Sequence, residues 1–260
     1  MKARAANVQQ AYVLHQYDWS ESSLILDLFT REQGRLAVVA KGAKRPYSQL
    51  RAVLLPFQCI QVTLSKPAKT THLTEGSTPE VVTLRAAEWA GGATMPSGAA
   101  LFSGYYLNEL LLKLLARHDP HAALFDAYAA TLPALHANED EQSQAALRAF
   151  ELRLLTEIGL LPDLSVATLT QQPLALDRSY MLSAESGVLP LVGDVPGFSG
   201  ATLVHLQAAL MHGSLPALQQ ACAAALPALK ASLRSLLYHH LGHKPLRTRQ
   251  VMLDVQKLME

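Results

Sequence analysis

The chain has 260 residues, of which half are apolar and 17% are charged, so its composition predicts packed globular domains and excludes an intrinsically disordered protein. The formal net charge is only +1, but residues 1–80 hold ten Lys and Arg against six Asp and Glu, while the remainder holds twelve against fifteen. The head of the chain is therefore the part that charge favours for contact with a polyanion.

Cysteine content and hydropathy exclude two further classes. Cys59 and Cys222 are the two cysteines, both in apolar surroundings, and two thiols cannot build a disulfide framework or a Cys-rich zinc site. We expect both to be buried and reduced. The N-terminus lacks a signal-peptide pattern, and no apolar run approaches the roughly 18 residues of a membrane span. These features predict a soluble cytoplasmic protein that makes no membrane contact.

The first 80 residues predict a small β-barrel. Apolar runs of strand length alternate with short polar turns, the clearest being Ile60, Val62 and Leu64 facing opposite to Gln61 and Thr63. Five short strands without a long helix between them predict a closed barrel of the oligonucleotide-binding (OB-fold) type over residues 1–78, although an SH3-like barrel also fits the pattern. The expected strands cover residues 7–19, 24–29, 36–40, 57–65 and 71–76.

Residues 79–260 predict a helical domain, because alanine and leucine dominate after residue 97. A connector with a short helix at 80–89 precedes it. Prolines and glycines exclude long helices from residues 160–199, which we expect to form a small irregular insertion with a hairpin at 180–192. The fold class is therefore α+β, in two domains. The expected helices begin near Ser97, Pro120 and Glu141, and then cover residues 200–212, 215–225 and 227–241.

The loop that follows residue 40 carries the candidate nucleic-acid site. It holds four cations and no acid, and two further arginines lie nearby; these six residues are Lys41, Lys44, Arg45, Arg51, Arg31 and Arg35. Cations grouped on a barrel attract phosphates by releasing counterions. The other interpretation is a solvated loop whose charges serve solubility alone. Bases could stack on Tyr12, Trp19, Tyr47 or Phe57, although aromatic residues in strands are more often part of the core.

A second basic cluster lies near the C-terminus, where no acid occurs from residue 230 to 249. Its members are Lys230, Arg234, Lys244, Arg247 and Arg249. They predict a basic face that assists DNA or partner binding. His239 and His243 have the spacing of half a zinc site, but a third ligand is missing, so we expect no metal and no cofactor.

Enzyme motifs are missing from the sequence. It contains no nucleophile elbow, no phosphate-binding loop and no dinucleotide-binding glycine pattern. Asp18, Glu21 and Asp27 are close enough in sequence to suggest the carboxylate cluster of a metal-dependent nuclease. Asp27 lies within an apolar strand, however, and Glu21 lies near a turn where it is better explained as a local cap. We therefore expect a protein that is not an enzyme.

Several segments resemble one known family. The order Glu-Ser-Ser from residue 21, Leu-Phe-Thr-Arg-Glu-x-Gly-Arg-Leu from residue 28 and Lys-Gly-Ala-Lys-Arg-Pro from residue 41 resembles the N-terminal domain of the bacterial RecO family. Tyr-Leu-Asn-Glu-Leu-Leu-Leu-Lys from residue 106, Arg-Ala-Phe-Glu-Leu-Arg from residue 148 and His-Leu-Gly-His-Lys-Pro-Leu-Arg-Thr-Arg from residue 240 are similar to later segments of that family. Many members carry four zinc-binding cysteines in the region of residues 160–199. This chain has none there, so its insertion must fold without the metal.

The resemblance implies a non-catalytic recombination mediator of DNA repair after DNA damage. Such proteins bind single- and double-stranded DNA, anneal complementary strands and cooperate with the RecR protein in the cytoplasm, at the nucleoid. They also bind the acidic C-terminal tail of single-stranded DNA-binding protein (SSB) and help to load the recombinase. An adaptor that binds proteins without touching DNA is the alternative. The DNA-binding residues expected here are Arg31, Arg35, Lys41, Lys44, Arg45, Arg51, Arg247 and Arg249, and the residues expected around the SSB tail are Lys113, Arg117, Arg148 and Arg153.

Overall fold

The computed structural model describes residues 8–65, 82–92, 94–136, 140–193 and 197–259, and the structural statements below concern these residues. The chain divides into two compact units, each described here by itself. The barrel unit comprises Met1–Met95 together with Leu107–Asp126, and the helical unit comprises Pro96–Tyr106 together with Ala127–Glu260.

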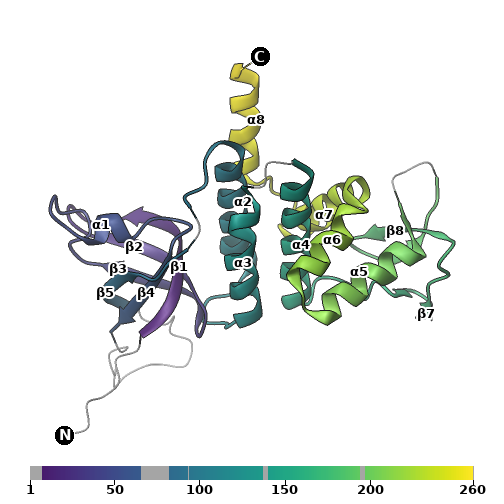
Figure 1. The fold of residues 1–260 in the computed structure, drawn as a ribbon, viewed down its shortest axis with the longest axis horizontal. Coiled ribbons are helices and arrows are strands. Elements are labelled where there is room, and N and C mark those ends of the chain that lie inside the picture. Colours follow the sequence, from purple (N-terminus) through teal and green to yellow (C-terminus); the bar gives the residue numbers. More distant parts are fainter. Residues whose placement is uncertain (1–7, 66–81, 93, 137–139, 194–196, 260) are drawn as a thin grey trace, which may run out of the picture. The chain divides into compact units, whose positions relative to one another are not determined.

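Five strands of the barrel unit close into a barrel in the order β1-β2-β3-β5-β4 (Figure 1). Neighbouring strands are antiparallel except β3 and β5, which are parallel. A short helix, α1, lies between β3 and β4 in the chain. This architecture confirms the predicted OB-type barrel. The elements are β1 (Val8–Asp18), β2 (Leu24–Thr30), β3 (Gly34–Ala40), α1 (Leu50–Val53), β4 (Cys59–Leu64) and β5 (Val82–Trp89).

Alternating side chains fill the barrel. In β4, Ile60, Val62 and Leu64 are buried while Gln61 is exposed, which confirms the predicted alternation. Similar residues from the other strands complete the core, and Leu54, just after α1, belongs to the same cluster. The members of this cluster are apolar, as expected for a space that excludes water.

The fifth strand differs from the expectation. Residues 71–76, where a strand was expected, lie outside the described residues. The helix expected at 80–89 is wrong, because β5 covers Val82–Trp89 and bonds to both β3 and β4. The open edges of these two strands need a partner before the barrel can close, and this tertiary demand overrides the weak helix preference of the segment.

The other predicted helices are confirmed within a few residues. In the helical unit, α4 packs against α6 and α7 and buries Leu147, Phe150 and Leu154 on one side. Helix α5 begins with Ser199, whose hydroxyl accepts a hydrogen bond from the Thr202 amide at 3.1 Å, and it ends at Gly213 in the left-handed conformation. The helices are α2 (Gly98–Leu114), α3 (Ala122–Ala134), α4 (Asp140–Glu157), α5 (Gly200–His212), α6 (Leu215–Ala223) and α7 (Leu226–His240).

A last helix, α8 (Arg247–Met259), was not predicted. Its Val251, Met252 and Leu253 are all 40% exposed or more, so little apolar surface of this helix is buried against the described residues. The last helix expected from the sequence covers residues 227–241. The signal that was overlooked is the helical spacing of Val251, Met252 and Val255.

The described part of the insertion, residues 160–193 and 197–199, contains short strands, and the predicted hairpin is confirmed as β8 with β9. Tyr180, Leu182 and Val188 are buried between them, and the Tyr180 hydroxyl accepts a hydrogen bond from the Ala175 amide at 2.9 Å. An apolar core therefore holds the described part of this insertion. The strands are β6 (Val166–Ala167), β7 (Gln172–Pro173), β8 (Ser179–Ser183), β9 (Gly187–Pro190) and β10 (Phe198–Ser199).

Within the described ranges, no helix has both the length and the apolar character needed to cross a bilayer.

Cys59 and Cys222 are both buried free thiols, as predicted. Burial raises the pKa of the Cys222 thiol to about 12, so it stays protonated and unreactive at neutral pH.

Candidate nucleic-acid interface

The basic loop, residues 41–51, begins at the end of β3. In the barrel, Ala40 of β3 pairs with Leu24 of β2, and Leu24 pairs with Asp18 of β1, so the end of β1 and the start of β2 lie beside this loop. Ala43 is fully buried in the barrel core and anchors the loop. Successive amide-to-carbonyl bonds from Arg45 to Gly42 and from Ser48 to Arg45 fold the loop into tight turns.

Three cations of the basic loop project into solvent. Lys41, Arg45 and Arg51 are exposed, and no ion pair to any of them occurs among the described residues. Tyr47 is 98% exposed between them. The loop therefore offers three positive charges that suit a phosphate backbone and an aromatic ring on which a base can stack.

Lys44 is different from its neighbours in the loop. Its ammonium group lies 2.9 Å from Asp18 Oδ1 and donates to the Ser20 carbonyl at 3.1 Å. Its backbone amide donates to the Ser22 carbonyl at 3.0 Å. The charge of Lys44 is thus largely satisfied by the turn between β1 and β2.

Arg31 lies in the turn between β2 and β3 and is committed to an ion pair. Its Nε and Nη2 donate to the two carboxylate oxygens of Asp126 at 3.0 and 2.8 Å, a bidentate arrangement. These bonds from Arg31 hold the pKa of Asp126 below its usual value. A phosphate would have to compete with Asp126 for this guanidinium.

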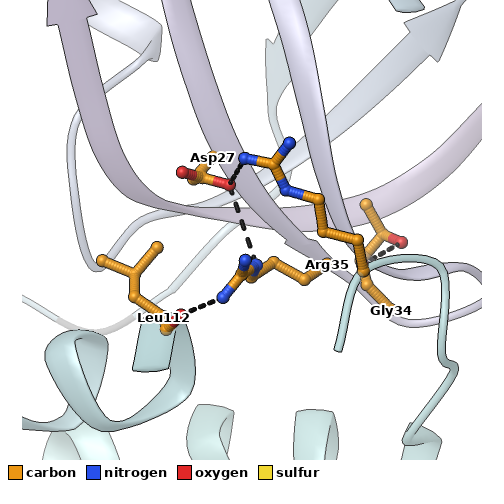
Figure 2. A network of polar contacts seen from close by, with 6 residues as sticks. Asp27, Gly34, Arg35 and Leu112 are labelled. Atoms are coloured by element: carbon orange, nitrogen blue, oxygen red, sulfur yellow. Dashed lines mark hydrogen bonds and ion pairs between the residues drawn. The ribbon is translucent and has the colours of Figure 1, made fainter. Parts of the chain in front are cut away.

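Arg35 joins β3 to the segment that follows α2. Figure 2 shows its guanidinium between Asp27 and Leu112: Nε lies 3.8 Å from Asp27 Oδ1, and Nη1 donates to the Leu112 carbonyl. Arg117 Nη2 lies 3.6 Å from the same Asp27 oxygen, and the His118 amide donates to the Arg35 carbonyl at 3.0 Å. Asp27 is 3% exposed. Burial lowers the pKa of Arg35, although Asp27 opposes that effect. Arg35 and Arg117 therefore connect strands β2 and β3 to the end of α2 and the residues that follow it, all within the barrel unit.

Of the four aromatic candidates, two belong to the core. Tyr12 is 4% exposed with its ring centroid 5.2 Å from that of Phe125, and Phe57 is 1% exposed. Trp19 and Tyr47 are exposed, by 65% and 98%. Trp89, which was not among the predicted aromatic residues, is also 65% exposed at the end of β5, and its indole N–H donates to Gln58 at 3.2 Å.

The residues expected around an acidic tail all have partners within their own unit. In the barrel unit, Lys113 lies 3.4 Å from Glu109, and Arg117 contacts Asp27. In the helical unit, Arg148 Nη2 lies 2.8 Å from Glu151 Oε1, and Arg153 Nε lies 3.7 Å from Glu157.

Arg148 belongs to a buried polar network. The Tyr106 hydroxyl donates to Glu151 Oε1 at 2.6 Å, and Glu151 is fully buried. Burial raises the pKa of both Tyr106 and Glu151, while the Arg148 charge opposes the rise at each.

Burial lowers the pKa of Arg249 on α8, and neighbouring Arg234 adds to that effect. Arg234 and Arg249 of the second basic cluster thus lie close enough for their charges to repel each other. Arg247, two residues before Arg249, is exposed.

The acids and histidines of the nuclease and zinc interpretations contact other side chains in the structure. Asp18 pairs with Lys44 and Asp27 faces two arginines, so their charge is neutralised by cations. The His239 and His243 rings touch at a centroid distance of 5.5 Å. Among the described residues, no group of three or more His, Cys, Asp or Glu side chains is placed to hold a metal ion.

A closed five-stranded barrel with a basic loop at one end defines the class: a protein with an N-terminal OB-fold followed by a helical region. Comparison with known families then narrows the class. The family described as "Recombination protein O N terminal" matches residues 6–83, and "Recombination protein O C terminal" matches residues 95–250. The chain belongs to the RecO family of DNA repair proteins.

Curated relatives agree with this assignment. The chain is 51% identical to the DNA repair protein RecO of Polaromonas naphthalenivorans, over 99% of this chain and 100% of the relative. It is 49% identical to those of Variovorax paradoxus, over 98% and 99% of the two chains, and of Acidovorax ebreus, over 99% and 100%.

Proposed function

We propose that this protein binds DNA through the basic loop, anneals complementary strands and mediates recombinational repair without catalysing a chemical step. The observation that carries the proposal is the group of three exposed cations, Lys41, Arg45 and Arg51, on an OB-type barrel. None of the three has an ion pair among the described residues, so their charge is available to phosphates.

Annealing requires charge neutralisation and no bond chemistry. Two complementary strands repel each other through their phosphates, and cations on one surface reduce that repulsion while the bases remain free to pair. The expected participation of Arg31 and Arg35 carries a cost, because each would have to leave an internal carboxylate or carbonyl. Phosphate contact in the barrel unit is therefore assigned to Lys41, Arg45 and Arg51, with Arg247 and Arg249 as a second basic surface in the helical unit.

Family membership supports a wider role. We propose that the protein acts on SSB-coated single strands at the nucleoid in the cytoplasm, cooperates with RecR and helps to load the recombinase. Lys113, Arg117, Arg148 and Arg153 stay candidates for the acidic SSB tail. An incoming carboxylate would replace the partner that each cation has now, Glu151 in the case of Arg148.

Titration of a fluorescent single-stranded oligonucleotide at several salt concentrations tests the proposal. The triple variant Lys41→Ala, Arg45→Ala and Arg51→Ala should weaken binding and reduce the slope of log K against log salt by about 2, since each contact to a single strand contributes about 0.7. The matched control replaces Arg85 and Arg178, which are exposed outside the basic loop. Equal affinity of both variants and wild type would contradict DNA binding by this loop. Retention of protein partners without salt-sensitive DNA binding would support the adaptor instead.

A further inference from the structure

Lys44 contacts the residues on either side of the exposed Trp19. Its ammonium group contacts Asp18 at 2.9 Å and the Ser20 carbonyl at 3.1 Å, and these two residues are the sequence neighbours of Trp19. The lysine is therefore bonded to the chain on both sides of Trp19, while the Trp19 side chain itself remains 65% exposed.

The turn that carries Trp19 is also held by its own hydrogen bonds. The amides of Trp19 and Ser20 donate to the Ser23 carbonyl at 3.2 and 3.3 Å, and the Ser23 amide donates to the Ser20 hydroxyl at 3.1 Å. The Lys44 amide closes the contact between this turn and the basic loop through the Ser22 carbonyl. The turn that presents the indole ring to solvent is thus restrained by five hydrogen bonds and one ion pair.

The charges around the ring favour a polyanion. Asp18 is matched by Lys44, which leaves Glu21 as the exposed acid of the turn, whereas the basic loop held against it presents Lys41, Arg45 and Arg51. An exposed aromatic ring on a restrained turn, next to a loop that carries cations, is the arrangement that single-strand-binding proteins use, with phosphates held by charge and a base stacked on the ring. An apolar protein surface would be a poorer match for a turn with this charge.

We propose that Trp19 stacks on an unpaired base, that Lys44 is a positioning residue for it, and that the pair gives the basic loop a preference for single strands over duplex. This inference rests on the proposed DNA binding and deepens it. Unpaired bases are required because both faces of a base within a duplex are already covered by its neighbours. Lys44 contributes through the turn and makes no phosphate contact of its own.

The first test compares Trp19→Ala with Trp89→Ala, because both rings are 65% exposed on the same barrel. Trp19→Ala should weaken binding of a single-stranded oligonucleotide about tenfold, change duplex binding less than twofold and leave the salt slope unchanged, since stacking releases no counterion. Trp89→Ala should change either affinity less than twofold. An equal loss on both DNA forms, or no loss for Trp19→Ala, would overturn the inference.

The second test separates positioning from phosphate contact. Lys44→Met should lower single-strand affinity without changing the salt slope, whereas Arg45→Ala should lower the slope by about 0.7. Adding Lys44→Met to Trp19→Ala should cause little further loss, and Lys44→Arg should restore most of the affinity. A reduced slope in Lys44→Met would make this lysine a phosphate ligand and overturn its positioning role.

Fluorescence provides a direct readout, since the chain has two tryptophans. In the Trp89→Phe protein, emission comes from Trp19 alone, and oligo(dT) should quench it while duplex DNA should not. If wild-type protein showed no salt-sensitive DNA binding, the proposed function and this inference would fail together. Normal, salt-sensitive binding with an unquenched Trp19 would overturn the inference alone.

Discussion

At the scale of single residues, the barrel unit depends on one glycine. Gly34 has φ = 68°, and a Cβ built at this position would lie 1.9 Å from the Asp119 carbonyl oxygen. The turn between β2 and β3 thus combines a conformation that favours glycine with a close approach of another backbone segment. Neighbouring Arg35 uses the same approach for its bonds to Leu112 and His118.

We predict that Gly34→Ala destabilises the protein by clearly more than the about 1 kcal/mol expected for alanine in a left-handed conformation. The matched control is Gly159→Ala, because Gly159 has φ = 71° and a Cβ added there would meet no described atom within 4 Å beyond its own turn. Urea unfolding of both variants measures the difference. Equal losses for the two would show that the approach of Asp119 is not close in solution.

Asp27 is the other critical residue at this scale. It is a buried acid whose Oδ1 faces two arginines, at 3.8 and 3.6 Å. We predict that Asp27→Ala lowers the free energy of unfolding by about 3 kcal/mol, because Arg35 would keep a buried charge without its carboxylate. Asp18→Ala, which removes an exposed acid from its pair with Lys44, should cost far less. Chemical denaturation at neutral pH distinguishes the two.

At the scale of elements, the Arg31–Asp126 pair joins the β2–β3 turn to α3 inside the barrel unit. Arg31 depresses the pKa of Asp126, so the pair stabilises the fold above the usual carboxyl pKa and loses its effect as pH falls through the lowered value. We predict that wild type has a higher urea midpoint than Arg31→Ala at pH 7, and that the difference disappears in strong acid. Because both side chains are about half-exposed, the difference should be small and should shrink further at high salt. A difference that persisted at low pH would mean that Arg31 acts through packing.

The elements that the sequence predicts well are those whose signals are local. Residues 200–212 have a serine cap, apolar helical spacing and a terminal glycine, and α5 has these same bounds. The β4 alternation is equally local. By contrast, β5 is a strand because β3 and β4 need a partner between them, and no feature within residues 82–89 expresses that need.

The candidate site shows the same division. The exposure of Lys41, Arg45 and Arg51 follows from a polar loop and was predictable. The partners of Arg31, Arg35 and Lys44 come from residues up to 95 positions away in the chain, at Asp126 in the case of Arg31. The sequence shows which residues are charged but not which charges are already neutralised by a partner. This is why, of six expected cations, only Lys41, Arg45 and Arg51 lack an ion pair among the described residues.

At the scale of the whole molecule, the physical barrel unit is not a continuous stretch of chain. It includes Leu107–Asp126, which contributes the Phe125 ring 5.2 Å from Tyr12 and 5.4 Å from Phe29. Asn108 Nδ2 also donates to the Leu14 carbonyl at 3.1 Å in a buried position. The barrel therefore completes its packing with parts of α2 and α3.

We predict that a fragment of residues 1–126 unfolds cooperatively and resists urea better than a fragment of residues 1–95, which would expose Tyr12 and Phe29 to water. In the full chain, Phe125→Ala should remove the same contact and cost about 3–5 kcal/mol, as truncation of a buried phenylalanine does. Leu169→Ala is the control, because Leu169 is 76% exposed and its truncation should have little effect. If the two fragments were equally stable, the strands alone would suffice for the barrel, and Leu107–Asp126 would lie against it without contributing to its stability.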